Sequence, residues 1–262
     1  MYRGYNIFTK IYYSTLKIVG IMQQAIQLPF EAFWLGISNK EFLHDIDKYY
    51  YDINPTYHSA EYNNQGFFEW EEKAVREHFS ECRTILVAGA GAGREMLALI
   101  EEGFEVCGFD CNESLVNLAH KNIEEKGYSA KVFLSDRDDT ADIDEIFDGI
   151  IVGWAVYMHI PERESRVEFL KKIRRNIKTD GPLLLSFFVR KGNPKNFQLL
   201  TSMANIIRKL LGKKKIDVGD RLAPNFIHYF TKDEIEKELS CARFSLVEFS
   251  AKQYGYAIAK AV

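Results

Sequence analysis

The clearest hydrophobic pattern in the chain is an uninterrupted apolar run over residues 84–88, followed by a glycine-rich turn and an amphipathic segment. A run without polar alternation is typical of a strand buried on both faces. The same succession recurs along the chain and predicts further strands over residues 105–110, 131–134, 147–154 and 183–189. Strands that alternate with helices indicate βαβ units. We therefore expect an α/β fold with a parallel sheet and helices on both of its faces.

The pattern changes after the fifth predicted strand. Residues 190–225 break the alternation and hold one predicted helix over residues 196–211. We interpret them as an insertion near the active site, on the side of the sheet where open α/β folds bind ligands. Thr231 and Glu234 have the spacing of a capping box, which predicts the start of a helix. The last predicted elements are that helix and two closing strands, over residues 231–239, 244–249 and 254–259.

Residues 1–65 differ from the rest of the chain. Apolar side chains recur there at helical spacing, which predicts a helical extension whose first helix ends at Pro29. The extension is rich in aromatic residues, namely Tyr2, Tyr5, Phe8, Tyr12, Tyr13, Phe30, Phe33, Trp34, Tyr49, Tyr50, Tyr51, Tyr57 and Tyr62. Three interpretations stay open: a helix that packs on the core, a lid whose tyrosines close an active site, and, because basic residues are few, only weak contact with a membrane surface.

Composition excludes several classes of protein. The formal charge of −3 offers no broad basic surface for nucleic acid. The four cysteines form no CxxC pair and have no metal-type spacing with histidine, so we expect no metal centre and a reducing, cytoplasmic location. No stretch predicts a signal peptide or a transmembrane segment. We interpret the acidic residues between 138 and 145 as a solvated loop and helix.

The turn after the first strand is the first candidate for chemistry. Gly89, Gly91 and Gly93 alternate there, and glycine lets backbone N–H groups approach a ligand closely. A dinucleotide-binding turn has a glycine at the sixth position, where this chain has Arg94. Asp110, at the end of the second strand, can accept both hydroxyls of a ribose placed over the turn. Because glycine-rich turns also occur without a ligand, the turn alone assigns no function.

Together with the segments that follow it, this turn resembles the first motif of class I methyltransferases, which use S-adenosylmethionine (SAM). Residues 108–115 resemble the second motif of that family, 147–152 the fourth, and 177–185 its entry into the fifth strand. The resemblance covers about residues 70–262 and implies a Rossmann-like, seven-stranded, mostly parallel sheet with an antiparallel last strand. It also implies SAM as the cofactor, bound by Ala88, Gly89, Ala90, Gly91, Gly93, Asp110, Cys111, Asp136, Arg137, Gly153 and Trp154.

The resemblance also indicates roles for single residues. In that family the acid at the position of Asp136 meets the adenine amino group, and the residue at the position of Arg137 contributes a backbone contact. Residues 66–262 are thus predicted to form a SAM-dependent methyltransferase domain after the extension. The chain lacks the Asn-Pro-Pro-Tyr signature that marks methylation of base amines and glutamine side chains, and Asp180-Gly181-Pro182 replaces the usual glycine pair before the fifth strand.

The predicted activity is methyl transfer to an oxygen or nitrogen of a small-molecule acceptor. His159, just past the fourth strand, is the candidate base because histidine titrates near neutrality. Tyr157 in the same segment and His228 before the last helix are further candidates. A histidine at a helix entry can also simply bond to the backbone. Two other functions stay open, an NAD(P)-dependent oxidoreductase and a non-catalytic binding module with the same fold.

Overall fold

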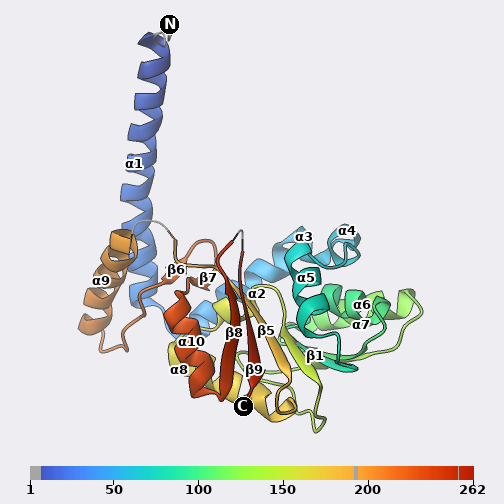
Figure 1. The fold of residues 1–262 in the computed structure, drawn as a ribbon. Coiled ribbons are helices and arrows are strands. Elements are labelled where there is room, and N and C mark those ends of the chain that lie inside the picture. Colours follow the sequence, from blue (N-terminus) through green and yellow to red (C-terminus); the bar gives the residue numbers. More distant parts are fainter. Residues whose placement is uncertain (1–6, 192–193, 253) are drawn as a thin grey trace, which may run out of the picture.

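A seven-stranded sheet forms the centre of the protein (Figure 1). The computed structural model describes residues 7–191, 194–252 and 254–262, without every side chain of the first helix. The strands are β1 (Thr84–Ala88), β2 (Glu105–Asp110), β3 (Lys131–Leu134), β4 (Gly149–Val152), β5 (Pro182–Phe187), β8 (Phe244–Ser250) and β9 (Gly255–Ala261), in the order β3-β2-β1-β4-β5-β9-β8. Neighbours from β3 to β5 are parallel, whereas β9 is antiparallel to both β5 and β8. The predicted α/β, Rossmann-like sheet is confirmed.

Helices cover both faces of the sheet and bury its central strands. One face packs against α5 (Glu69–His78), α6 (Arg94–Glu101) and α7 (Glu113–Glu125), and the other against α8 (Arg163–Ile173) and α10 (Lys232–Cys241). In β1, Ile85 and Val87 belong to the first of these cores, while Leu86 and Ala88 belong to the second. Successive strand residues point to opposite faces, so a strand buried on both faces must be apolar throughout. This is why the run over residues 84–88 has no polar alternation.

The N-terminal segment begins with the long helix α1 (Ile7–Ile37), which packs beside the sheet on α9 (Pro194–Leu210) and the hairpin β6 (Asp220–Leu222) and β7 (Phe226–His228) (Figure 1). Arg221 of β6 pairs with Glu31 of α1, with Nε and Oε2 2.6 Å apart. The helix predicted over 196–211 corresponds to α9, which lies against α1. Within the described residues, none of the insertion 190–225 lines the cavity described below.

Three shorter helices follow α1, namely α2 (Lys40–Ile53), α3 (Pro55–His58) and α4 (Ala60–Asn63). Asn54 lies between α2 and α3, and its side chain accepts a hydrogen bond from Thr56 N at 3.1 Å. Pro55 occupies the first position of α3, where a proline needs no N–H partner. In the described part of the chain, no helix combines the length and apolar character needed to cross a bilayer.

Two local predictions are wrong. Helix α1 does not end at Pro29 but runs through it. Proline removes one helical hydrogen bond, and packing of the next turn, through Ala32 and Leu35, against α9 outweighs that loss. Residues 135–146 contain no helix. Asp138 within them is not solvated, because its side chain is only 4% exposed and faces cations from α2.

The start of α10 confirms the predicted capping box of Thr231 and Glu234. Further along this helix, Glu238 is fully buried and accepts hydrogen bonds from the buried Arg166 of α8, at 2.8 Å from Nη2. The Tyr157 hydroxyl donates a further hydrogen bond to the same carboxylate at 2.6 Å. A buried charge is tolerated only when it is paired and hydrogen-bonded. This cluster therefore fixes α8 and α10 relative to each other.

We expect Glu238→Gln to lower the free energy of unfolding by about 3–5 kcal/mol, because it leaves the buried Arg166 guanidinium without its nearest counter-ion. Chemical denaturation followed by circular dichroism measures the loss. Glu236→Gln, at an exposed position of the same helix, is the matched control and should change stability by less than about 0.5 kcal/mol. Equal stability of the two variants would contradict this role for Glu238.

Candidate active site

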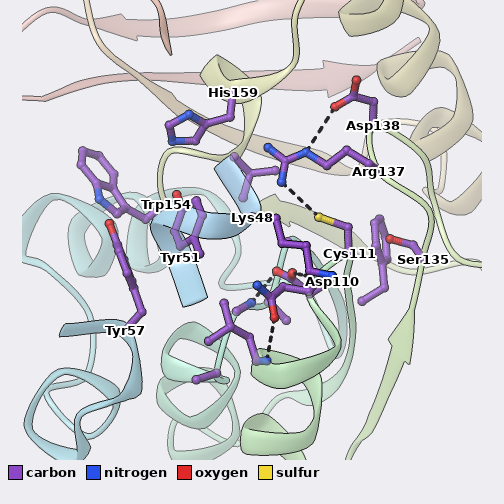
Figure 2. Close-up of a pocket in the computed structure, with 18 of the residues that line it drawn as sticks. Lys48, Tyr51, Tyr57, Asp110, Cys111, Ser135, Arg137, Asp138, Trp154 and His159 are labelled. Atoms are coloured by element: carbon purple, nitrogen blue, oxygen red, sulfur yellow. Dashed lines mark hydrogen bonds and ion pairs between the residues drawn. The ribbon is translucent and has the colours of Figure 1, made fainter. Parts of the chain in front are cut away.

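A cavity lies at the carboxyl ends of β1, β2 and β4 (Figure 2). The turn after β1 and the segments after β2, β3 and β4 form most of its lining. Helices α2 to α4 supply a second part of the lining, with His44, Lys48, Tyr51, Tyr57 and Tyr62. Open α/β sheets bind ligands at this edge, because loops from several strands meet there. The N-terminal extension and the sheet therefore share one cavity.

The glycine turn after β1 adopts a backbone that favours glycine. Gly89, Gly91 and Gly93 have φ angles of 79°, 52° and 93°, all in the left-handed region. A Cβ on Gly89 would collide with Val156, and a Cβ on Gly153 would collide with the Gly89 carbonyl oxygen, so the segments after β1 and β4 are in direct contact. A Cβ on Gly91 would meet no atom within 4 Å. The turn thus leaves room for a ligand at Gly91.

Asp110 ends β2 at the edge of the same cavity. Its Oδ2 accepts a hydrogen bond from Gly91 N, and its Oδ1 accepts one from Asn112 N, both at 2.8 Å. Burial raises the pKa of Asp110, and these backbone N–H groups oppose the rise because they favour the charged form. Each carboxylate oxygen has a second lone pair. The side chain lines the cavity and could therefore also accept hydroxyl groups of a ligand.

The segment after β3 brings Asp136 and Arg137 to the cavity. Asp136 is exposed, and no hydrogen bond to its carboxylate is found among the described residues. Arg137 was expected to act through its backbone, but its side chain is engaged as well: Nη1 lies 3.5 Å from the Cys111 Sγ, and Nη2 is paired with Asp47 of α2. Asp136 could therefore meet a ligand, whereas the Arg137 guanidinium joins the sheet to the N-terminal segment.

His159 reaches the cavity from the short helix η1 (Val156–His159) after β4. The residue is 7% exposed, and its Nδ1 lies 2.6 Å from the Phe226 carbonyl oxygen. Burial lowers the pKa of His159, and the nearby Asp47 carboxylate opposes this. A neutral ring that donates its Nδ1–H to the carbonyl keeps Nε2 unprotonated. His159 therefore has the protonation state of a base.

Two other predicted catalytic residues do not line the cavity. The Tyr157 side chain is buried among the charged groups of α8 and α10, where it donates to Glu238. His228 in β7 is 1% exposed, and its Nδ1 lies 2.6 Å from the Asp220 Oδ1. Their positions along the chain were near the site, but their side chains point into the protein interior. Three predicted cofactor residues are also absent from the lining, namely Ala88, Gly93 and Gly153.

Tyrosines and Trp154 form an aromatic part of the wall. The ring centroids of Tyr51 and Tyr57 are 4.7 Å apart, and those of Tyr57 and Tyr62 are 5.5 Å apart. Burial raises the pKa of Tyr57 to about 12 and also raises the pKa of Tyr51 and Tyr62. These hydroxyls are therefore protonated at neutral pH. The wall offers flat apolar faces with hydrogen-bonding groups at their ends.

Charged side chains hold α2 against the segment after β3. Asp47 is 1% exposed and pairs with Arg137. Lys40 Nζ and His44 Nε2 lie 2.9 and 2.8 Å from the same oxygen of Asp138. Burial acts to raise the pKa of Asp138, but His44 and Lys40 outweigh it and hold that pKa below its ordinary value. We call these five residues the charged seam.

Comparison with known proteins identifies a domain within the chain. Residues 85–181 match the family described as methyltransferase domain. That range holds the glycine turn, Asp110, the segment after β3 and His159. The chain contains a class I SAM-dependent methyltransferase domain. SAM is the methyl donor of this family, which agrees with the resemblance seen in the sequence.

Individual methyltransferases resemble the chain over different lengths. A glycine/sarcosine N-methyltransferase from Aphanothece halophytica is 31% identical over 114 residues, which is 43% of this chain and 42% of that protein. The match thus spans less than half of this curated relative. A SAM-dependent methyltransferase from Methanosarcina mazei has a TM-score of 0.59 at 21% identity, over 75% of this chain and 99% of that one.

A second solved methyltransferase is the 1,6-didemethyltoxoflavin-N1-methyltransferase from Burkholderia thailandensis, with bound 1,6-didemethyltoxoflavin and S-adenosylhomocysteine. Its TM-score is 0.61 at 16% identity, over 86% of this chain and 92% of that one. At these identities the two solved structures support the fold. They do not assign an acceptor.

Sequence reasoning missed part of the methyltransferase cavity. Glu95 lines it, and its Oε1 accepts hydrogen bonds from Trp154 N at 3.0 Å and Arg94 Nη2 at 2.7 Å. An acid in the first turn of the helix after the glycine turn was a visible signal for this residue. Lys48 had no such signal, because α2 belongs to no recognised motif. Only the fold brings this residue to the cavity.

We expect Asp138→Asn to destabilise the protein by about 1–3 kcal/mol at neutral pH, because Lys40 and His44 lose a charged acceptor. The folded-state pKa of Asp138 is lowered, so its contribution is present above the ordinary aspartate value of 3.8 and is lost as the pH falls below it. Chemical denaturation across this range measures the effect, with the exposed Asp142→Asn as control. A penalty that persists unchanged at low pH would contradict the charge-based explanation.

Proposed function

We propose that the protein transfers the methyl group of SAM to a nitrogen or oxygen atom of a small organic acceptor. The observation that supports this most is that the glycine turn, Asp110, His159 and the tyrosine wall all line one cavity. In Figure 2, Tyr51, Tyr57, Trp154 and His159 gather toward one end, whereas Asp110, Cys111 and Ser135 lie toward the other. Such a cavity can hold a donor and an acceptor side by side.

We assign the methyl donor to the end of the cavity that holds Asp110. There Asp110 accepts the ribose hydroxyls, the glycine turn lies against the rest of the cofactor, and Asp136 meets the adenine amino group. Both acids follow a strand end and retain acceptor capacity, which supports the assignment. Bound SAM supplies an electrophilic methyl group on a sulfonium. The protein's main task is then to hold the acceptor atom in line with that group.

We assign the methyl acceptor to the end of the cavity that holds the tyrosines and His159. The Nε2 atom of His159 takes the proton that an ammonium or hydroxyl acceptor loses, and the hydrogen bond to the Phe226 carbonyl holds the ring in the required tautomer. The aromatic wall excludes water. This strengthens the electrostatics around a sulfonium whose charge disappears during transfer.

We further propose that residues 1–65 act as a cover for a methyltransferase domain formed by residues 66–262. The support comes from α2 to α4, which contribute Tyr51, Tyr57 and Tyr62 to the cavity wall. Tyr2 and Tyr5 lie outside the described residues, as do the side chains of Phe8, Tyr12 and Tyr13. The cover is thus assigned to the part of the extension that follows α1.

A hydride-transferring oxidoreductase is less well supported. Arg94 takes the place of the third glycine of a dinucleotide-binding turn, and its side chain is 2% exposed and paired with Glu71 and Glu95. The third glycine of a dinucleotide-binding turn permits close packing of the helix on the strand, and the buried Arg94 side chain is not compatible with that packing. A non-catalytic module remains distinguishable by experiment, because it would bind SAM without turnover.

We expect Asp110→Ala to weaken SAM binding by about 1–3 kcal/mol, because the ribose hydroxyls lose a charged acceptor. Titration calorimetry measures the affinity, and NADH and NADPH serve as ligands of the competing class that should not bind. Asp144→Ala, in an exposed loop, is the control and should bind SAM as the unchanged protein does. Unaltered affinity in the Asp110 variant would refute the assigned donor end.

We expect His159→Gln to lower kcat by about 10²–10⁴-fold while the affinity for SAM is kept, because a general base contributes a factor of that size. The assay is S-adenosylhomocysteine release over a panel of small amines, phenols and alcohols. His78→Gln is the control, because the ring of His78 on α5 pairs with Glu248 on β8 and does not line the cavity. Undiminished turnover in the His159 variant would exclude it as the base, and no turnover of any acceptor by the unchanged protein would favour the non-catalytic module.

A further inference from the structure

Helix α1 carries a row of exposed apolar side chains that the fold leaves uncovered. Its members share one face of the helix and are between 49% and 72% exposed, namely Val19, Met22, Ile26, Phe30 and Phe33. Their spacing of three, four, four and three residues places them in one continuous stripe. From Val19 to Phe33 this stripe is about 21 Å long, at the rise of an α-helix. We call it the α1 ridge.

The opposite face of α1 packs against the rest of the protein, mainly against α9. Ala32 and Leu35 are buried against Leu200 and Ala204 of α9. A Cβ on Gly36 would lie 2.7 Å from the Ile207 Cβ, which shows how closely the two helices approach. A helix that only packs on a core is apolar on one face and polar on the other. The α1 ridge is therefore surplus to folding, and surfaces of this kind mark interaction sites.

The surroundings of the ridge indicate which partner it fits. Figure 1 shows the first half of α1 standing clear of the rest of the fold. Residues 18–30 contain no charged residue, and residues 1–30 contain Arg3, Lys10 and Lys17 but no acid, although the whole chain has a formal charge of −3. An apolar stripe next to a segment whose charged residues are all basic is complementary to an anionic lipid surface. Two copies joined through α1 would instead bring two basic segments together.

Helix α9 repeats the arrangement beside α1. Leu199, Ile206 and Leu210 are more than half exposed and recur at helical spacing, while Leu200 and Ala204 on the same helix are buried. The exposed Lys209 precedes Leu210, and the segment that follows continues with Lys213, Lys214 and Lys215. Apolar side chains with lysines at their border are the composition of helices that lie in a membrane interface.

We infer that the α1 ridge docks this protein on the surface of a membrane that contains anionic lipids, with α1 lying in the interface. The catalytic cavity is built by other residues, so the inference is independent of the proposed methyl transfer. Docking would retain the enzyme at a lipid surface, and the projecting half of α1 would reach that surface first.

The test is cosedimentation of the full chain with vesicles of phosphatidylcholine, with and without phosphatidylglycerol. The protein should pellet with the anionic vesicles, and added salt should weaken the binding because surface charge contributes to it. Met22→Glu combined with Ile26→Glu should reduce binding by about tenfold or more, since two apolar side chains no longer enter the interface. Val19→Glu provides a second, single substitution on the projecting part.

Ile146→Glu is the matched control, because Ile146 is 61% exposed in the loop before β4 and lies outside the ridge. SAM affinity of every variant, measured by calorimetry, shows that each is folded. Protein that stays in the supernatant with anionic vesicles would overturn the inference, whatever its oligomeric state. It would equally be overturned if ridge variants with normal SAM affinity pelleted as well as Ile146→Glu, or if the ridge variants only converted a dimer into a monomer in light scattering.

Discussion

The ion pair between Asp47 and Arg137 is the interaction on which the arrangement of the cavity depends. It joins residues 90 positions apart in the sequence, one on α2 and one in the segment after β3. Asp47 is almost completely buried, and its Oδ1 has no hydrogen-bond partner among the described residues while lying 3.9 Å from the His159 Nδ1. Removing one partner of such a pair leaves a buried charge, which costs about 3–5 kcal/mol. Helix α2 therefore has one strongly preferred place.

That place explains how the cavity unites groups from distant parts of the chain. Besides the charged seam, the Asn112 side chain donates a hydrogen bond to Asp52 of α2 at 2.9 Å, so α2 also contacts the turn after β2. The segments after β2 and β3 are those to which we assign the donor. In this account α2 and bound SAM both contact the segments after β2 and β3. The position of α2 also sets the position of the tyrosine wall, because α3 and α4 continue from α2. Binding of the donor and closure of the cover are then coupled.

The sequence predicted the parts of this structure that depend on local patterns. The apolar run over residues 84–88, the alternation of strands and helices and the Thr231 cap each reflect contacts between near neighbours, and the structure confirms them. Asp110, Asp136 and His159 were selected because each lies at or after the carboxyl end of a strand, where the loops meet, and all three line the cavity. The same reasoning selected Tyr157 and His228, whose side chains are buried and do not line the cavity, because position along the chain does not give the direction of a side chain.

The contribution of α2 could not be predicted in this way. Lys40, His44 and Asp47 have the appearance of an ordinary charged helix face. Of their partners, Asp138 belongs to the acidic stretch that we interpreted as a solvated loop and helix, and Arg137 directly precedes it. Pairing between them is a property of the tertiary structure. The passage of α1 through Pro29 is a similar case, because packing against α9 decides it rather than the propensity of proline.

Amide hydrogen exchange of the full chain, with and without S-adenosylhomocysteine, tests the coupling of cover and cofactor most directly. The account predicts slower exchange with the ligand in α2, over residues 40–53, together with the turn at Asp110 and the segment 135–138. Protection confined to the glycine turn and these two segments, with the exchange of α2 unchanged, would contradict it.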